Sequence, residues 1–459
     1  MRERRFWNEE IETLSQEELR EIQWQKLQKQ IKYCFHNSDF YRRKFVDAGA
    51  YPEDIKSIED FRQLPTFLTK EEDRQSQEQS REKYGHPFGL NLCANPRNIR
   101  AVHSTSGTTG VPTFYAYTQH DLEVQNEVLA RGFWRLGFRP GDRVIHGFGL
   151  SMWLGGLAII RGLEHLGCLV FPVGAEGGTE RFLNFMKLGK PKYMTCTPSF
   201  AEYLIRKAPD VLGMDVEELG IKKIVTAGEP GAGLPEVRKL IEGAYGCRLY
   251  DGAGGPWGMW TASCDAPEYQ GLHCFSEDYC PQVFDLMDTE TKKPIDLVEG
   301  AVGEIVMTAL EWEASPPMRY ALGDVYQVAL SRCPHCGHPW PRFKFFGRVD
   351  DLLIVKGVNT YPAGVRDVVM SFVPRVTGEM RIVLETPPPR VVPPLKMKVE
   401  YGVDVSDTDL DSLKKEIESA IGKKLRVTPK IEMVPPNSLP RDPAKKLQLL
   451  EKRYKKSDQ

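Results

Sequence analysis

Between residues 143 and 245 the chain alternates short apolar runs with longer amphipathic stretches. This pattern predicts strands at 143–148, 168–173, 193–196 and 223–226, and helices at 154–166, 179–188, 199–207 and 234–245. Alternating strands and helices form βαβ units, so the expected fold class is α/β with a mainly parallel sheet. Ligands of such sheets bind beyond the carboxyl ends of the strands. Functional residues are therefore expected in the loops that follow these strands.

After about residue 346 the pattern changes to short strands around one helix. Strands are expected at 351–355, 380–385, 398–401 and 430–434, with a helix at 407–421 capped by Ser406 or Asp407. The proline-rich segment 387–394 is expected to form a stiff loop between two of these strands. A chain of 459 residues also exceeds one ordinary core. We therefore expect a large N-terminal domain over 1–346 and a small, mobile α+β domain over 347–459.

The composition indicates a globular protein and argues against several classes of partner. The 61 basic and 63 acidic residues leave a net charge of −2, so no electrostatic field favours nucleic acid. No apolar run approaches the roughly 20 residues of a membrane helix, and the N-terminus turns acidic where a signal peptide is apolar. Ten cysteines in such a chain are expected to be reduced, apart from a metal site. These observations predict a cytoplasmic protein with neither nucleic-acid nor membrane partners.

Hydroxyl residues and glycines cluster at 103–112, in the run HSTSGTTGVP. Glycines allow the backbone to turn tightly, and the freed N–H groups and hydroxyls can hold phosphates. The run is not a GxxxxGK[ST] P-loop because the lysine is absent, and a flexible surface loop is the alternative. The candidate phosphate-binding residues are Ser104, Thr105, Ser106, Gly107, Thr108, Thr109 and Gly110.

This run resembles the phosphate-binding signature of phenylacetate–coenzyme A ligases, a family of acyl-adenylating enzymes. The likeness extends to residues 6–12 and 40–45 near the start, and similar landmarks continue to residue 446. The resemblance implies that ATP, with Mg²⁺, converts a carboxylate to an acyl adenylate, from which coenzyme A takes the acyl group. A homodimer is expected only by analogy with the family.

The resemblance also assigns nucleotide-binding residues beyond the loop. Gly228, Glu229 and Pro230 follow the expected strand at 223–226 and resemble the family's adenine-contacting turn. Tyr250 occupies the position of an aromatic residue that packs on adenine in the family. Packing in the core is the ordinary alternative for an isolated tyrosine.

Two further segments resemble the family's ribose-binding and hinge residues. In the segment Met318–Val325, Asp324 matches an aspartate that accepts both ribose hydroxyls, a role suited to an acceptor-only carboxylate. In the segment 347–362, Arg348 matches a second ribose contact and Asp350 matches the hinge of the small domain.

A lysine close to the C-terminus matches the family's catalytic position. In the segment 437–446, Lys445 corresponds to the lysine that bridges the acyl carboxylate and the α-phosphate, and Lys446 is its neighbour. A cation there neutralises two anions without changing its protonation state.

The chain departs from the family pattern at three positions. Val111 stands where the phosphate loop usually has lysine, and Ala253 and Gly254 stand where the family has Ser or Thr followed by a magnesium-binding Glu. Asp251 or Glu229 is the candidate replacement for that carboxylate. These departures support an alternative hypothesis, in which a ligase-like protein binds nucleotide without turnover.

The run CPHCGH at 333–338 predicts a zinc knuckle, because two thiolates separated by two residues can bind one ion. Cys333 and Cys336 need two more ligands, and the resemblance implies that these are Cys264 and His273. With four protein ligands the zinc would be structural. The competing ligands are Cys274, Cys280, His335 and His338.

Aromatic residues near the strand ends predict a flat apolar pocket for the acid. The principal candidates are Phe148, Ala227 and Trp257. The further candidates are Leu150, Trp153 and Trp260. The most consistent hypothesis is an ATP-dependent aryl or arylacetate–CoA ligase acting on a small aryl carboxylic acid. A related enzyme that gives the acyl group to an amine is the nearest alternative.

Overall fold

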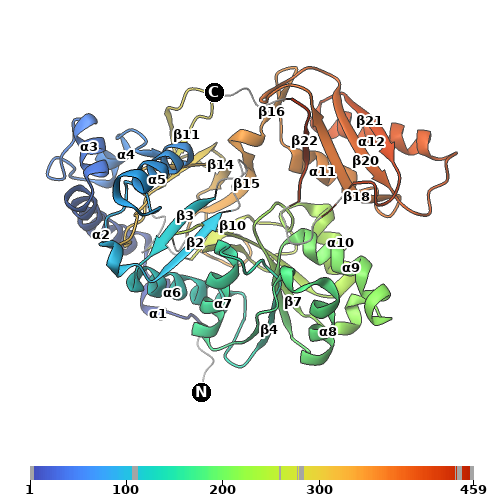
Figure 1. Cartoon of the computed structure of the whole chain (residues 1–459), viewed down its shortest axis with the longest axis horizontal. Helices are drawn as coiled ribbons and strands as arrows, with labels where there is room; N and C mark the ends of the chain where they lie inside the picture. The colour runs from blue at the N-terminus through green and yellow to red at the C-terminus, as the bar shows by residue number, and fades with distance from the viewer. Residues whose placement is uncertain are drawn as a thin grey trace.

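A computed structural model describes residues 5–105, 112–257, 260–275, 278, 284–439, 441 and 447–454. The chain forms a large N-terminal part and a smaller C-terminal part, which is coloured orange to red in Figure 1. The helices α9 (Pro198–Leu212) and α10 (Pro235–Tyr245) of the large part lie beside the small part. Among the described residues, no helix is long and apolar enough to cross a membrane.

The predicted βαβ units form a block of five parallel strands. Their order is β8-β7-β6-β4-β5, and every neighbouring pair is parallel. The strands are β4 (Arg143–His146), β5 (Leu169–Phe171), β6 (Tyr193–Cys196), β7 (Lys223–Thr226) and β8 (Arg248–Gly254). The helices α7 (Leu154–Leu166) and α8 (Thr179–Gly189) join α9 and α10 in connecting them. This block confirms the α/β fold class, with boundaries close to those predicted except for α9, which continues five residues beyond the expected end at 207.

The same sheet continues beyond β8 as antiparallel strands, which the sequence pattern does not reveal. Its full order is β12-β11-β13-β14-β15-β10-β9-β8-β7-β6-β4-β5, and β1 (Leu68–Thr69) pairs in parallel with β14. The added strands are β9 (Trp260–Ser263), β10 (Leu272–Cys274), β11 (Asp285–Met287), β12 (Pro294–Ile295), β13 (Val302–Met307), β14 (Tyr320–Ala329) and β15 (Arg342–Arg348). Most have two to four residues, too few to establish a period of two.

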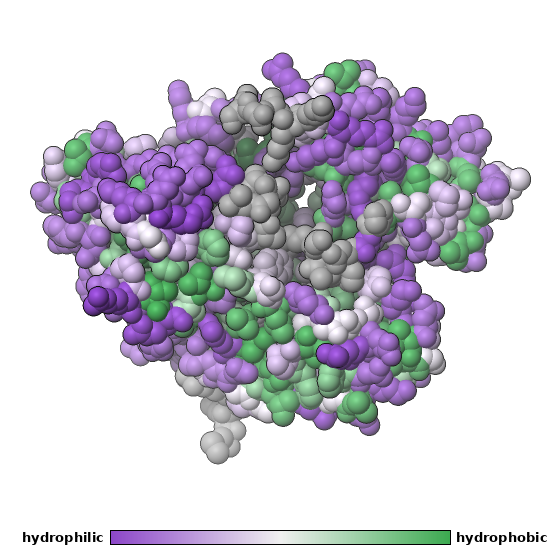
Figure 2. Space-filling model, viewed as in Figure 1, coloured by the Kyte–Doolittle hydropathy of each residue, from purple (hydrophilic) through white to green (hydrophobic). Residues whose placement is uncertain are grey.

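The remaining elements of the large part surround this sheet. A separate hairpin consists of β2 (Ala101–Thr105) and β3 (Thr113–Tyr117). The helices are α1 (Glu9–Glu12), α2 (Gln16–Asn37), α3 (Asp39–Asp47), α4 (Ile58–Arg62), α5 (Lys70–Tyr84) and α6 (Gln119–Arg135). Short 3-10 turns cover Pro96–Asn98, Ala175–Gly177 and Val216–Leu219. Figure 2 shows a hydrophilic surface over α5 and hydrophobic residues gathered around α7 and α8.

The small part contains two sheets around its own core. One has the order β17-β16-β19 and the other β21-β20-β18-β22. The elements are the 3-10 turn η4 (Val349–Asp351), β16 (Leu353–Val355), β17 (Val358–Thr360), α11 (Pro362–Met370), β18 (Val376–Leu384), β19 (Arg390–Val391), β20 (Leu395–Tyr401), α12 (Leu410–Leu425), β21 (Pro429–Val434) and β22 (Leu450–Lys452). Apolar residues of β18, β20 and α12 share the core.

The predicted start of α12 is wrong. The residue before its first turn is Asp409, and neither Ser406 nor Asp407 caps the helix. The Ser406 hydroxyl instead donates to the Asp409 carboxylate at 2.7 Å. This local hydrogen bond occupies the side chains that would otherwise cap the backbone, so the helix begins three residues later than expected.

Candidate functional site

The loops after the parallel strands meet at one edge of the sheet, as expected for an α/β protein. Phe148 follows β4, and Ala227 and Gly228 follow β7; Phe148 and Ala227 are buried. The Trp153 ring lies 6.1 Å from the Phe148 ring. It also covers Gly228, where a Cβ atom would lie 2.9 Å from the tryptophan. Gly228 has a φ of +89°, so glycine suits this position for both space and conformation. The structure thus brings Phe148, Trp153 and the 227–228 turn together.

This edge is joined to the strand that leads into the phosphate loop. The backbone N–H of Ser104 donates to the Met152 carbonyl at 2.7 Å. In the hairpin, Ser104 pairs with Phe114 and Thr105 pairs with Thr113. The predicted phosphate-binding residues Ser106, Gly107, Thr108, Thr109 and Gly110, and the variant position Val111, lie outside the described residues.

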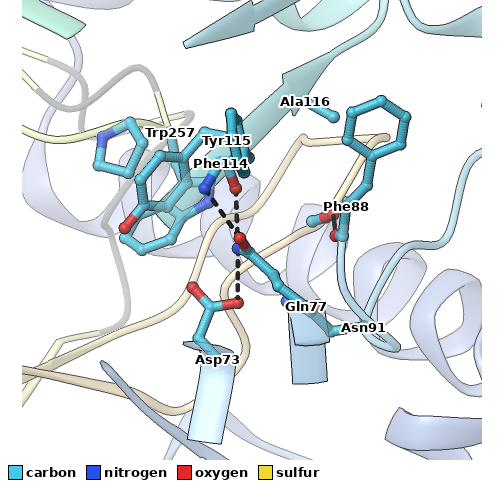
Figure 3. A pocket seen from close by; sticks show the side chains of 10 residues that line it. Asp73, Gln77, Phe88, Asn91, Phe114, Tyr115, Ala116 and Trp257 are labelled. Carbon is cyan, nitrogen blue, oxygen red and sulfur yellow. Dashed lines mark hydrogen bonds between the residues drawn. The ribbon is translucent and has the colours of Figure 1, made fainter. Parts of the chain in front are cut away.

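Two predicted aromatic pocket residues belong to other surroundings. Trp257 packs edge-on against Tyr115 at 5.6 Å and against Tyr320 at 4.9 Å, so it lies between β3 and β14 (Figure 3). Trp260 is 3% exposed and packs over Gly132 of α6, where a Cβ atom would lie 2.2 Å from its ring. Trp260 therefore packs against α6 in the core of the large part.

The helix α5 connects the phosphate-loop hairpin to β14. The Gln77 side-chain amide donates to the Phe114 carbonyl, and its oxygen accepts from the Phe114 N–H, both at 2.8 Å (Figure 3). One helical turn earlier, the Asp73 carboxylate accepts from the Tyr320 hydroxyl at 3.5 Å. Asp73, Gln77 and Trp257 line a small cavity of about 10 Å³. The sequence signal for this helix was its capping box, Thr69 with Glu72.

The Asp73 carboxyl is buried and accepts hydrogen bonds from the neutral side chains of Gln77 and Tyr320. Burial raises its pKa from 3.8 to about 7. Between those values the folded chain keeps a proton that the unfolded chain has released. The free energy of unfolding is therefore expected to fall as the pH rises from about 4 to about 7, by up to about 1.4 kcal/mol per pH unit.

Asp73→Asn should remove this contribution, because the amide cannot ionise. The urea midpoint, measured at intervals across that pH range, should vary less with pH in Asp73→Asn than in the unaltered protein. Asp210→Asn, at an exposed position on α9, serves as the matched control. Equal slopes in all three proteins would contradict the assignment.

The predicted ribose and hinge residues come together where β14 and β15 pair. Asp324 is directly opposite Arg348 in the antiparallel register, and the two side chains form an ion pair. The Arg348 Nε also donates to the Asp350 carboxylate at 2.9 Å. Asp350 lies in η4, between the large and small parts. The register of two adjacent strands thus brings together residues that the sequence placed 24 positions apart.

Lys70, at the start of α5, is a cation at this cluster that sequence analysis missed. Burial lowers its pKa, repulsion by Arg348 lowers it further, and attraction by Asp350 and Asp324 opposes both effects. The pairing of Leu68 with Tyr320 positions α5 here. The sequence carries a local signal only for the start of α5, which is the capping box. The approach of Lys70 to Asp324 depends on the pairing of β1 with β14.

Tyr250 and Asp251 lie within β8. The Tyr250 side chain is 5% exposed and belongs to the core cluster that contains Tyr193 and Trp260. The Asp251 carboxylate accepts from the Tyr269 hydroxyl at 2.6 Å, and burial raises its pKa to about 6. Tyr250 thus packs in the core of the large part, and Asp251 is hydrogen-bonded within it.

Glu229 connects the predicted adenine turn to the C-terminal segment. One carboxylate oxygen accepts from the Ser199 N–H at 2.8 Å, and the other accepts from the Leu447 N–H at 2.6 Å. Leu447 follows the predicted catalytic position Lys445 by two residues, although Lys445 itself lies outside the described residues. Pro230 lies next to this carboxylate in the same turn.

Four predicted metal ligands converge at the other end of β14 and β15. The ligand atoms of Cys264, His273, Cys333 and Cys336 all lie within 4.8 Å of one another. Cys264 follows β9, His273 lies in β10, and the two remaining cysteines lie between β14 and β15. These separations suit one tetrahedral ion with sulfur and nitrogen ligands.

The competing ligands are positioned differently. The His335 side chain contacts Asp265 at 3.2 Å, and the His338 ring lies edge-on to His273 at 5.1 Å. The convergent group contains neither of them, nor Cys274, while Cys280 lies outside the described residues.

The small part is the first element that identifies the class of protein. A family model described as the AMP-binding enzyme C-terminal domain matches residues 357–453. Together with the strand-end site and the Asp324–Arg348 pair, this match identifies an acyl-adenylating enzyme.

Curated relatives then specify the family. The chain is 33% identical to the phenylacetate–coenzyme A ligase of Thermus thermophilus, over 96% of this chain and 98% of that protein. It is 30% identical to the enzyme of the same name from Pseudomonas putida, over 79% of this chain and 77% of that protein. The chain belongs to the phenylacetate–coenzyme A ligase family.

A solved relative matches the whole chain in a particular state. The crystal structure of 2-hydroxyisobutyryl-CoA ligase in the postadenylation state is 29% identical, covers 98% of this chain and 93% of that one, and gives a TM-score of 0.88. The thioesterification state of the same ligase, also 29% identical, covers 99% and 94% and gives a TM-score of 0.70.

Proposed function

We propose that this protein is an ATP-dependent ligase that joins a small aryl or arylacetic acid to coenzyme A. In the first step a carboxylate oxygen attacks the α-phosphorus of ATP, and pyrophosphate leaves. In the second step the coenzyme A sulfur attacks the acyl carbon, and AMP leaves. The observation that carries this proposal is the hydrogen bond from the Leu447 N–H to Glu229, because it ties the segment after Lys445 to the adenine turn.

Each part of the site then has a role in holding ATP. Asp324 accepts the ribose hydroxyls, and Arg348 holds that carboxylate in place and adds a second contact. Residues 104–110 hold the phosphates. Lys70 contributes positive charge beside the nucleotide, which offsets the valine at 111. Lys445 bridges the acid and the α-phosphate.

Magnesium does not fit the two carboxylates that the sequence suggested as replacements. Asp251 is bound to Tyr269, and Glu229 is occupied by two backbone N–H groups. We therefore assign Mg²⁺ to the ATP phosphates and water, which suits its preference for retaining several waters.

We assign binding of the acid to the strand-end residues Phe148, Trp153 and Ala227. Phenylalanine and tryptophan faces favour a flat ring over a branched aliphatic acid. The composition supports a cytoplasmic enzyme with no nucleic-acid or membrane partner.

The four convergent cysteine and histidine ligands fit a structural zinc ion. They leave no open coordination position, so the ion would take no part in the reaction. It would join the β9–β10 pair to the connection between β14 and β15. Asp324 and Arg348 lie toward the opposite ends of these two strands.

The decisive experiment measures pyrophosphate release from ATP and Mg²⁺ with a panel of aryl and arylacetic acids, with and without coenzyme A. Acid-dependent release and a thioester product are expected. Release with an amide product when an amine is supplied would favour the amide-forming alternative. ATP binding by calorimetry without release for any acid would favour the non-catalytic binder, for which Ala253 and Gly254 are the supporting residues.

A further inference from the structure

One face of α9 is directed at the small C-terminal part. Ser199, Glu202, Tyr203 and Arg206 follow the spacing of three, one and three residues that places side chains on one side of a helix. The helix begins directly after β6, at the ligand edge of the sheet. Contacts from this face therefore connect the strand ends to the small part.

The centre of this interface is a buried ion pair. Arg366 of α11 donates to the Glu202 carboxylate at 2.5 Å, and the two side chains are 2% and 6% exposed. Glu202 belongs to the large part and Arg366 to the small part, 164 positions later. Neighbouring charges, Glu379 and Glu229, also attract Arg366.

Further polar contacts surround the pair. Arg441 donates to the Ser199 carbonyl, binds Glu379 at 2.9 Å, and lies over the Tyr203 ring at 5.5 Å. Arg206 donates to the Thr377 carbonyl at 3.1 Å. The contacts named around the pair are thus charged and polar, while Met370 of α11 packs into the apolar core of the large part.

The central pair is incompletely satisfied. Among the described residues, the Nε and Nη1 atoms of Arg366 and the Oε1 atom of Glu202 are buried without a hydrogen-bond partner. A buried ion pair with unmet hydrogen bonds contributes little compared with apolar side chains of the same size. Removing one partner is costly, because the other charge then stays buried alone. Such a pair holds two surfaces together, and separating these surfaces costs little free energy because both charges regain water.

We propose that Glu202 and Arg366 are positioning residues that form a releasable latch between the two parts. The latch holds the small part in the orientation needed for adenylation, and its weak net stabilisation permits release for the coenzyme A step. The arrangement that contains these contacts matches the postadenylation state of the solved relative with a TM-score of 0.88, and the thioesterification state with 0.70. This inference rests on the proposed two-step reaction.

The test separates the two half-reactions. Adenylation is followed by acid-dependent exchange of pyrophosphate into ATP, and thioester formation is followed with chemically prepared acyl adenylate and coenzyme A. Glu202→Gln should slow adenylation by roughly 10-fold to 100-fold, since Arg366 loses its counter-charge, and should leave thioester formation within about 2-fold of the unaltered enzyme.

A double variant gives the opposite result. Glu202→Leu with Arg366→Met replaces the pair with apolar groups, which should strengthen the interface. Adenylation should persist, while thioester formation should fall by roughly 10-fold or more, because the small part is released less often. The matched control is Asp210→Asn, at an exposed position of the same helix.

A second measurement does not depend on turnover. Hydrogen exchange of peptides from α9 and α11 should increase in Glu202→Gln and decrease in the double variant, with unchanged exchange in α6. Equal loss of both half-reactions in Glu202→Gln, or unchanged exchange at α11, would overturn the latch. Absence of adenylation in the unaltered enzyme would instead refute the proposed function, and the exchange experiment would still decide the latch.

Discussion

Replacing Lys445 with alanine is expected to slow adenylate formation by roughly 10²-fold to 10³-fold, the usual effect of removing one group that stabilises transition-state charge. The reaction brings a carboxylate and an α-phosphate together, and a cation between them offsets their repulsion. The Leu447–Glu229 hydrogen bond keeps the nearby chain at the adenine turn. Two residues of chain span at most about 7 Å, so the backbone of Lys445 is within that distance of this anchor.

Pyrophosphate exchange measures this loss, and Lys446→Ala is the matched control. Thioester formation from supplied acyl adenylate should remain, because the lysine acts only in the first step. If Lys446→Ala abolishes exchange while Lys445→Ala retains it, the catalytic assignment is wrong.

Replacing Cys336 with serine is expected to abolish binding of the proposed zinc ion and to destabilise the fold. A ligand that binds only the folded state stabilises it by about 4 kcal/mol when its concentration is 1,000 times its dissociation constant. Losing that contribution should lower the melting temperature by several degrees for a chain of this size. The same change is expected when a strong chelator removes zinc from the unaltered protein.

Metal content by mass spectrometry and thermal unfolding check this result together. Cys274→Ala is the matched control, because this buried thiol is in β10 beside the cluster but outside the convergent group. A purified protein without zinc, whose unfolding is insensitive to chelator, would contradict the metal site. The KM for ATP should also rise in Cys336→Ser, because the cluster braces the strands that carry Asp324 and Arg348.

The elements that could be predicted from the sequence are those whose signals are local. The parallel block was predicted because each strand and helix carries its own apolar period, and β6 and β7 were predicted with the observed bounds. The Cys333–Cys336 knuckle was recognisable because two ligands lie within four residues. The antiparallel strands were missed since segments such as β10 and β12 are too short to show a period.

The sequence by itself determined the family, the fold class and the residue types available for adenylation, because motifs and periodicity depend on near neighbours in the chain. Tertiary structure alone decided that Glu202 meets Arg366, that Glu229 holds Leu447, and that Trp260 fills the space over Gly132. Such pairings join residues more than 100 positions apart. They depend on strand register and on the docking of the small domain, and neither leaves a local pattern in the chain.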